Sequence, residues 1–203
     1  MRARQWLVTA AAGLFGFAAV ALCAVYVVSF RGDHGVPGIA SIGGPFTLTD
    51  DTGATVTEKT LAGKPYAIYF GYTFCPDVCP TTLFDLTRWI QKLGPDADKL
   101  NYVFVTVDPE RDTVKTMHAY LSSFDKHIRG YTGTPEQIAQ IAKVYRVYYK
   151  KVPSADGSYT MDHSAIIYLM GPDNNFVTVI PYQEDDASAV AKLKSLAALT
   201  PTS

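Results

Sequence analysis

The sequence predicts a compact α/β sandwich preceded by one N-terminal transmembrane helix. Three observations lead to this prediction. A long uncharged run stands near the amino terminus, and apolar segments of strand length alternate with helical patterns in the rest of the chain. The composition is that of a globular domain, with 48% hydrophobic residues and 18 basic against 19 acidic side chains. This balance excludes a disordered chain and a protein that binds nucleic acid through its charge.

The uncharged run, 6–30, is long enough to cross a membrane. Its 25 residues span roughly 37 Å as a helix, more than the bilayer core of about 30 Å. A cleavable signal has a shorter apolar part, and Cys23 follows a leucine where a lipoprotein signal needs a small residue. Arg2 and Arg4 favour a cytoplasmic amino terminus. We therefore expect a cytoplasmic stub and uncleaved anchor over 1–30, with the remainder on the periplasmic or intermembrane-space side.

The next segment, 31–44, is rich in glycine, lacks apolar periodicity and is predicted to be a tether. The folded domain is predicted over 45–203. It opens with β-rich stretches at 46–49 and 54–57 around turn-forming residues 50–53, which predicts a hairpin.

Two nearly continuous apolar runs, 65–72 and 101–107, have the length of strands buried on both faces. Between them, apolar residues recur at helical spacing, and the pattern ends at Gly94 and Pro95, a common helix stop. The apolar positions are Leu83, Leu86, Ile90 and Leu93. Strand, helix and strand together predict a βαβ unit.

The remaining predicted elements alternate in type. They are helices at 113–124 and 135–148, strands at 165–169 and 176–180, and a helix at 185–199. Thr134 is suited to cap the second of these helices, because Pro135 follows it at the first helical position. Alternating strands and helices, with an opening hairpin and a closing antiparallel pair, predict the α/β sandwich.

Cys75 and Cys79 follow the first central strand, at the sheet edge where open α/β sheets bind ligands. Pro80 is expected at the first helical position, which places both sulfurs at the positive end of a helix and favours thiolate. Three residues separate the cysteines, against two in a thioredoxin-type catalyst. The pair alone is consistent with a redox-active disulfide, a metal site or inert packing.

Two thiolates make an incomplete metal site, so a histidine is the natural third ligand. His163 stands immediately before an apolar strand, a junction from which its side chain can reach the same sheet edge. His34 lies in the tether, and His118 and His127 lie in charged surroundings typical of surface histidines. Two cysteines and one histidine favour a soft ion, with copper first and zinc second.

Three stretches agree in order and spacing with one known family. They are Gly71 to Pro80 (Gly-Tyr-Thr-Phe-Cys-Pro-Asp-Val-Cys-Pro), Val105 to Thr113 (Val-Thr-Val-Asp-Pro-Glu-Arg-Asp-Thr), and Asp-His-Ser at 162–164 followed by Tyr-Leu-Met-Gly-Pro at 168–172. They resemble the SCO/SenC family, the copper chaperones of cytochrome c oxidase assembly, and the likeness covers nearly all of 44–182.

The resemblance implies a thioredoxin-like fold with an additional β-hairpin. It also implies that copper is held by Cys75, Cys79 and His163, as Cu(I) and also as Cu(II) with a fourth ligand from water or a carboxylate. Asp108 ends the neighbouring predicted strand and is expected close to the metal, in the second shell or as a weak axial ligand.

The implied function is a membrane-tethered metallochaperone. It would deliver copper to the dinuclear centre of cytochrome c oxidase subunit II, or reduce the cysteines of that centre, with a copper donor and a thiol reductant as further partners. The alternative is a thiol-disulfide oxidoreductase or thiol peroxidase with Cys75 and Cys79 as catalytic residues. His163 separates the two, because disulfide exchange does not require an imidazole. A sensor of redox state or copper is a third class of function. No feature of the sequence, such as an attached output domain, favours it.

Three smaller expectations concern residues near these motifs. Glu110, Arg111 and Asp112 are expected to form an exposed charged turn. Asp77 is expected to bond its own backbone. Met161 is expected to point away from His163 on an extended segment.

Overall fold

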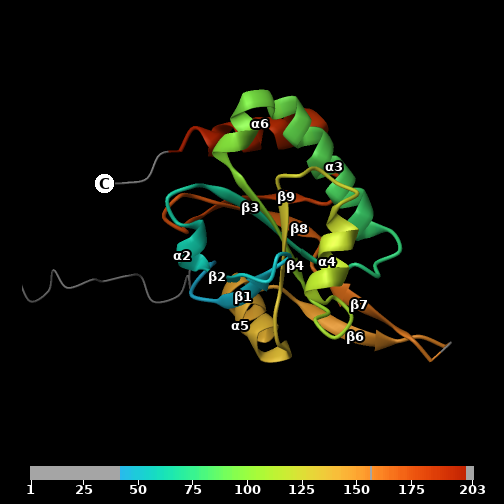
Figure 1. The fold of residues 1–203 in the computed structure, drawn as a ribbon. Helices are drawn as coiled ribbons and strands as arrows, with labels where there is room; N and C mark the ends of the chain where they lie inside the picture. The colour runs from blue at the N-terminus through green and yellow to red at the C-terminus, as the bar shows by residue number, and fades with distance from the viewer. Residues whose placement is uncertain (1–41, 156, 200–203) are drawn as a thin grey trace, which may run out of the picture. The chain divides into compact units, whose positions relative to one another are not determined.

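The computed structural model describes residues 42–155 and 157–199. They form one seven-stranded sheet with helices packed on it and a separate two-stranded hairpin (Figure 1). The predicted stub, the anchor and most of the predicted tether lie outside the described residues. Within the described part of the chain, no helix is both long enough and apolar enough to span a membrane.

The sheet has the strand order β2-β1-β5-β4-β3-β8-β9. Its strands are β1 (Thr47–Asp50), β2 (Thr55–Thr57), β3 (Tyr66–Gly71), β4 (Asn101–Thr106), β5 (Ile128–Thr132), β8 (Ile166–Met170) and β9 (Phe176–Pro181). β3, β4 and β5 run parallel, whereas β1 with β2 and β8 with β9 form antiparallel pairs at the two edges. The predicted βαβ unit, opening hairpin and closing pair are all present.

The helices and the separate hairpin complete the domain. They are α2 (Glu58–Leu61), α3 (Val78–Leu93), the 3₁₀ helix η1 (Gly94–Lys99), α4 (Val114–Leu121), α5 (Pro135–Tyr145), α6 (Asp186–Ala197), and strands β6 (Tyr149–Pro153) and β7 (Tyr159–His163). In Figure 1 the hairpin of β6 and β7 projects from the lower right of the molecule.

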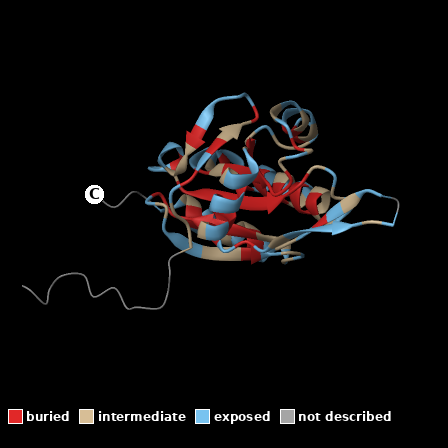
Figure 2. Cartoon of the chain, turned by 90° about the horizontal axis from the view of Figure 1, so that it is seen from below, coloured by how far each residue is buried: buried red, intermediate tan, exposed pale blue. Residues whose placement is uncertain are grey.

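Strand β3 is buried along its whole length, and its side chains alternate between two helical layers. Tyr66 and Phe70 face α5: the hydroxyls of Tyr66 and Tyr145 are 2.8 Å apart, and the rings of Phe70 and Tyr145 are 5.4 Å apart. Gly71 faces α3, where Cys79 lies. Figure 2 shows the buried residues concentrated on the central strands and the helix faces that cover them. The core therefore holds the carboxyl end of β3 in a rigid frame.

The end of a predicted helix differs from the structure, and three strands of the structure were not predicted. The helix predicted to 148 ends at Tyr145, because Arg146 adopts the left-handed conformation with φ of 56° and β6 begins three residues later. Strand β5 was missed because Arg129 and Gly130 interrupt its apolar pattern. Strands β6 and β7 were missed because most of their residues are exposed and polar.

The last residues of the predicted tether contact the domain. Ile42 packs against the core, and the amide of Gly43 donates to the carbonyl of Val144 at 2.9 Å. A Cβ on Gly43 would lie 2.9 Å from Met170 Cε, and its φ is +97°. Only glycine fits this approach. The boundary between tether and domain stays a prediction.

Candidate metal centre

Cys75 and Cys79 lie on the loop and helix that follow β3. The amide of Cys75 donates to the carbonyl of Tyr72 at 3.3 Å, and the amide of Cys79 donates to Cys75 Sγ at 3.4 Å. Helix α3 begins at Val78 with Asp77 as its N-cap, so Pro80 occupies the third helical position instead of the predicted first. The expected consequence holds, because both sulfurs lie at the positive end of the helix.

Cys79 approaches the strand closely because residue 71 has no side chain. A Cβ on Gly71 would lie 2.9 Å from Cys79 Sγ and 2.7 Å from Phe104 Cε2, both far inside ordinary contact. Cys79 itself is fully buried, whereas Cys75 is half-buried. The glycine thus sets where the buried sulfur sits.

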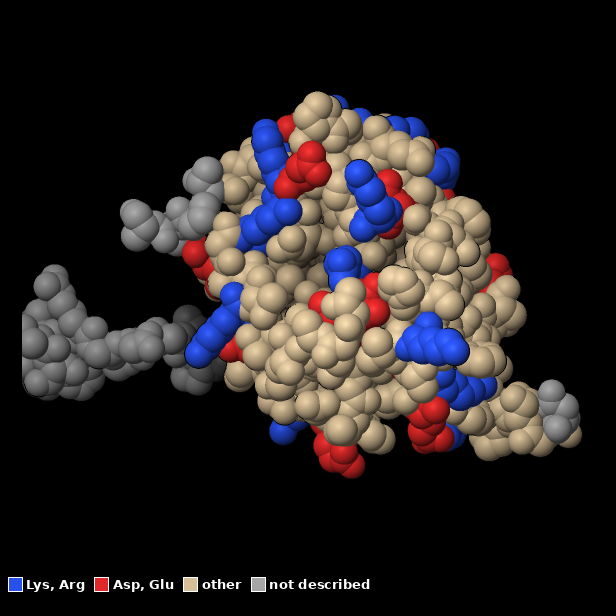
Figure 3. Space-filling view, in the orientation of Figure 1, with Lys and Arg blue, Asp and Glu red and all other residues tan. Residues whose placement is uncertain are grey.

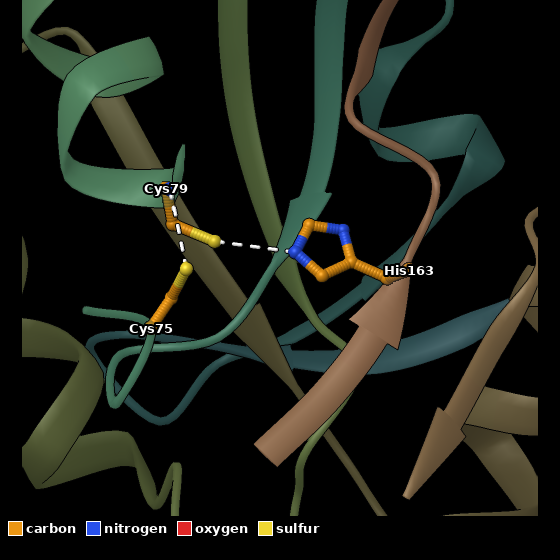
Figure 4. A group of neighbouring side chains, drawn as sticks. All are labelled: Cys75, Cys79 and His163. Atoms are coloured by element: carbon orange, nitrogen blue, oxygen red, sulfur yellow. Dashed lines mark hydrogen bonds between the residues drawn. The ribbon is translucent and has the colours of Figure 1, made fainter. Parts of the chain in front are cut away.

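His163 reaches the cysteines from the end of β7. Its Nδ1 is 3.1 Å from the carbonyl oxygen of Ser164, and its Nε2 is 3.4 Å from Cys79 Sγ (Figure 4). A carbonyl oxygen only accepts hydrogen bonds, so Nδ1 carries the hydrogen and donates. In the neutral ring Nε2 then presents its lone pair to the cysteines, which is the arrangement of a metal-ligating histidine.

The ligand atoms of Cys75, Cys79 and His163 all lie within 4.8 Å of one another. In Figure 4 the two sulfurs and the imidazole nitrogen point toward a common centre from the loop, from α3 and from the hairpin. A cavity of about 270 Å³ opens onto Cys75 and His163. The structure brings the three predicted ligands together, with Cys75 and His163 on the cavity and Cys79 buried behind them.

The other histidines lie elsewhere. His118 has 67% of its side chain exposed and lies 3.5 Å from Asp51. His127 lies between two carboxylates, 2.6 Å from Asp125 and 3.0 Å from Asp98. His34 is outside the described residues.

The two thiols differ in acidity. The hydrogen bond from Cys79 is the largest cause that lowers the pKa of Cys75, to about 3, with further help from His163 and backbone amides against the effect of burial. The neighbouring Cys75 sulfur and burial raise the pKa of Cys79. In the metal-free pair the thiolate is therefore favoured on the half-buried Cys75 and the proton on the buried Cys79.

This asymmetry predicts the alkylation pattern of the reduced, metal-free protein. We expect the rate of alkylation of Cys75 by iodoacetamide to stay nearly constant as the pH falls from about 8 to about 6. Over the same range the alkylation rate of an ordinary thiol, with a pKa of about 8.5, falls close to 100-fold. Cys79 should stay unlabelled in the folded protein because it is buried. Peptide mass spectrometry measures both rates, with the urea-unfolded chain as control. A rate at Cys75 that falls like that of an ordinary thiol would contradict the prediction.

Asp108 does not join the three ligand atoms. Both of its carboxylate oxygens are used by other residues: Arg111 Nε donates to one, and the Tyr159 hydroxyl donates to the other at 2.9 Å. Asp108 is 2% exposed. Its expected place near the metal stays a prediction, and the structure connects it to the site only through Arg111 and Tyr159.

The prediction of an exposed charged turn at Glu110, Arg111 and Asp112 is wrong. Asp112 is fully buried, Arg111 is half-buried, and only Glu110 is exposed. Asp112 accepts from the amide of Thr73 at 3.0 Å, from its hydroxyl at 2.5 Å, and from the Thr106 hydroxyl at 2.6 Å. Charge alone suggested exposure. The hydroxyl residues that satisfy the carboxylate lie on other segments, and only the fold brings them to it.

The prediction that Met161 points away from His163 is also wrong. Met161 stands two residues before His163, so on β7 the two side chains share the inner face, and Met161 is buried. Its side chain and His163 line the same cavity. The side chain of Asp77 makes no capping hydrogen bond.

Fold and site together define a class of protein, a thioredoxin-like domain that gathers two thiols and an imidazole at the end of its central strand. The SCO1/SenC family model matches residues 36–198. The chain belongs to this family.

Relatives and solved structures agree with that assignment. ScoI of Bradyrhizobium japonicum, solved with copper bound, is 54% identical with a TM-score of 0.73, covering 77% of this chain and 99% of that one. ScoI of Arabidopsis thaliana, also solved with copper bound, is 44% identical with a TM-score of 0.72, covering 76% and 97%. The mitochondrial Protein SCO1 homolog 1 of Arabidopsis thaliana is 48% identical over 141 residues, covering 69% of this chain and 42% of the relative. The chain spans about half the length of the curated relatives it matches.

Proposed function

We propose that this protein binds one copper ion at Cys75, Cys79 and His163 and acts in the assembly of cytochrome c oxidase. The single observation that carries the proposal is the convergence of two sulfurs and one imidazole nitrogen within 4.8 Å. The relatives solved with copper bound support it, since they are 54% and 44% identical to this chain.

The chemistry of the donor set fits copper as cargo. Cu(I) takes soft thiolate and imidazole ligands readily, and three such ligands suffice for it. Cu(II) needs a fourth ligand, which water or a carboxylate can supply through the cavity beside Cys75 and His163. The same opening would admit the ligands of an acceptor protein, so that copper can be passed on.

The acceptor in this proposal is the dinuclear copper centre of oxidase subunit II. The protein would work while tethered by the apolar segment 6–30, with its domain on the periplasmic or intermembrane-space side. A tether raises the local concentration of a chaperone near a membrane-bound partner, which favours a short-lived transfer complex.

Reduction of that centre is a second candidate role, favoured by the asymmetry of the thiols. Cys75 as thiolate would attack a disulfide of the partner and form a mixed disulfide, releasing one partner thiol. Cys79, once deprotonated, would attack Cys75 and release the second partner thiol. The partner disulfide is reduced by two electrons, and Cys75 and Cys79 are oxidised to a disulfide.

A transfer experiment tests the proposal. The reduced protein is loaded with Cu(I), mixed with the copper-free soluble domain of oxidase subunit II, and separated from it before both are analysed for copper. We expect copper to move to the acceptor, and none to be retained by the Cys75→Ser, Cys79→Ser variant. Failure of the parent to retain copper would refute the binding site. Retention without transfer, together with reduction of an oxidised acceptor, would favour the thiol role.

Oxidation of the cysteine pair is expected to prevent copper uptake, because a disulfide removes both thiolates from the donor set. After the disulfide is verified by mass spectrometry, copper bound per protein is expected to fall from one to none, and dithiothreitol should restore it. Undiminished binding by the oxidised protein would show that copper sits elsewhere.

A further inference from the structure

The ligands come from segments far apart in the chain, and one turn contacts both. The turn Asp108–Asp112 follows β4. It meets the loop 72–77 between β3 and α3, here called the cysteine loop, where Asp112 accepts two hydrogen bonds from Thr73. It also meets the hairpin of β6 and β7, here called the His163 hairpin, where Asp108 accepts from Tyr159. Basic and acidic side chains are interspersed on the face drawn in Figure 3. Charge alone therefore does not distinguish any one residue. One arginine in this turn is distinguished because it is partly buried and contacts both ligand segments.

Arg111 is that residue. Its guanidinium carbon lies 3.7 Å from the ring centroid of Tyr159, 4.8 Å from that of Phe74 and 5.7 Å from that of Tyr72. Arg111 Nη1 donates to the backbone carbonyl of Tyr159 at 3.1 Å, and Nε donates to Asp108. One planar cation thus contacts the residue just before Cys75 and the first residue of β7, whose last residue is His163.

The contact reaches the imidazole through an aromatic neighbour. The rings of Tyr72 and His163 meet edge to face with centroids 5.8 Å apart. Arg111 therefore holds the ring that the imidazole packs on, and it also holds the start of the strand that ends in His163. Lysine cannot reproduce this, since it lacks the flat fork that donates in two directions while stacking on rings.

We infer that Arg111 is a positioning residue that fixes the His163 hairpin against the cysteine loop and so sets the distance from His163 Nε2 to the sulfurs. The inference rests on the proposed copper site and adds to it the residue that assembles it. A buried ion pair such as Arg111 with Asp108 is a poor means of stabilising a fold, because desolvation offsets the attraction. The contacts of Arg111 with both ligand segments instead indicate that it positions one segment against the other.

The first test uses the metal-free, reduced protein. Nuclear Overhauser contacts between the His163 ring and the Tyr72 ring are recorded in the parent, in Arg111→Lys, and in the double variant Asp108→Asn, Arg111→Met. The double variant leaves no unpaired buried charge and guards against misfolding of the turn. We expect the contacts to weaken or vanish in both variants.

Lys151→Met is the matched control. Lys151 is the other cation on Tyr159, with Nζ 4.0 Å from the ring centroid, and it pairs with exposed Glu110 at 2.7 Å. Among the described residues its ion pair is with Glu110 and its ring contact is with Tyr159, both outside the cysteine loop, so the control is expected to keep the His163 contacts. Unchanged contacts in the Arg111 variants would overturn the inference, whether or not the protein binds copper.

The second test is a double-mutant cycle on copper retention against a Cu(I) chelator. Arg111→Lys is expected to lower retention at least about 10-fold, as losses of partners around metal ligands do. In the His163→Ala background the same change should cost less than about 2-fold, because the arginine acts through the histidine. Additive losses would overturn the inference. If the parent retains no copper, the proposed function fails, and the contacts in the metal-free protein still decide the role of Arg111.

Discussion

His163→Ala is expected to lower the affinity of the reduced protein for Cu(I) by at least about 100-fold, beyond the 10- to 100-fold that loss of a partner around a metal ligand costs. The histidine supplies the only nitrogen among the three gathered ligand atoms of the described residues. Two thiolates remain in the variant, so it binds copper weakly instead of not at all. Competition against a graded series of Cu(I) chelators measures the change.

His118→Ala is the matched control for this prediction. His118 is exposed and lies against Asp51, away from the cysteines, so its removal should leave copper affinity unchanged. Equal retention in the parent and in His163→Ala would remove His163 from the site. That outcome would favour thiol-disulfide exchange as the function of the cysteine pair.

Asp112→Ala is expected to lower the free energy of unfolding by roughly 3 kcal/mol, because it leaves buried donors without an acceptor. The carboxylate accepts the amide and hydroxyl of Thr73 and the hydroxyl of Thr106, which ties the cysteine loop to β4. Urea unfolding followed by circular dichroism measures the loss, with an unchanged m-value showing that two-state behaviour is kept. A loss below about 1 kcal/mol, the net worth of one hydrogen bond, would contradict the assigned network.

Asp112→Asn separates hydrogen bonding from charge. Its amide keeps an acceptor for one donor and can donate to the Thr73 hydroxyl, so we expect a smaller loss of stability than for alanine.

Burial raises the pKa of Asp112 above its usual 3.8, so folding favours the protonated carboxyl. That stabilisation is complete below pH 3.8 and is lost as the pH rises through the raised pKa. The difference in free energy of unfolding between the parent and Asp112→Asn should therefore shrink as the pH rises from 3.8. A difference that grows with pH would contradict this prediction.

The βαβ unit was predictable because its signals are local. The strands β3 and β4 appear as continuous apolar runs, and α3 appears as a helical repeat ending at Gly94. These patterns reflect burial on two faces and on one face, and they need no knowledge of distant residues. They also placed Cys75 and Cys79 at the end of β3, which is where the structure has them.

Elements with weak local signals could not be predicted. Strand β5 contains Arg129 and Gly130 and is held in the sheet by β4 and β1 on either side. Strands β6 and β7 carry exposed, charged residues and pair only with each other among the described strands. The burial of Asp112 depends on Thr73, 39 residues away. In each case the stabilising partner lies outside the segment, so no pattern within the segment reports it.

By itself the sequence determined the α/β class, the cysteine pair at the end of a central strand, and, through motif resemblance, the three residues expected to hold copper. Only the tertiary structure decided that Cys79 Sγ and His163 Nε2, 84 residues apart in the chain, lie 3.4 Å from each other. It also decided which imidazole nitrogen faces the sulfurs and which arginine joins the two ligand segments. The physical reason is range. Strand and helix preferences act over a few neighbouring residues, whereas hydrogen-bond partners, cation–π contacts and thiol acidity depend on groups that meet only when the whole sheet is packed.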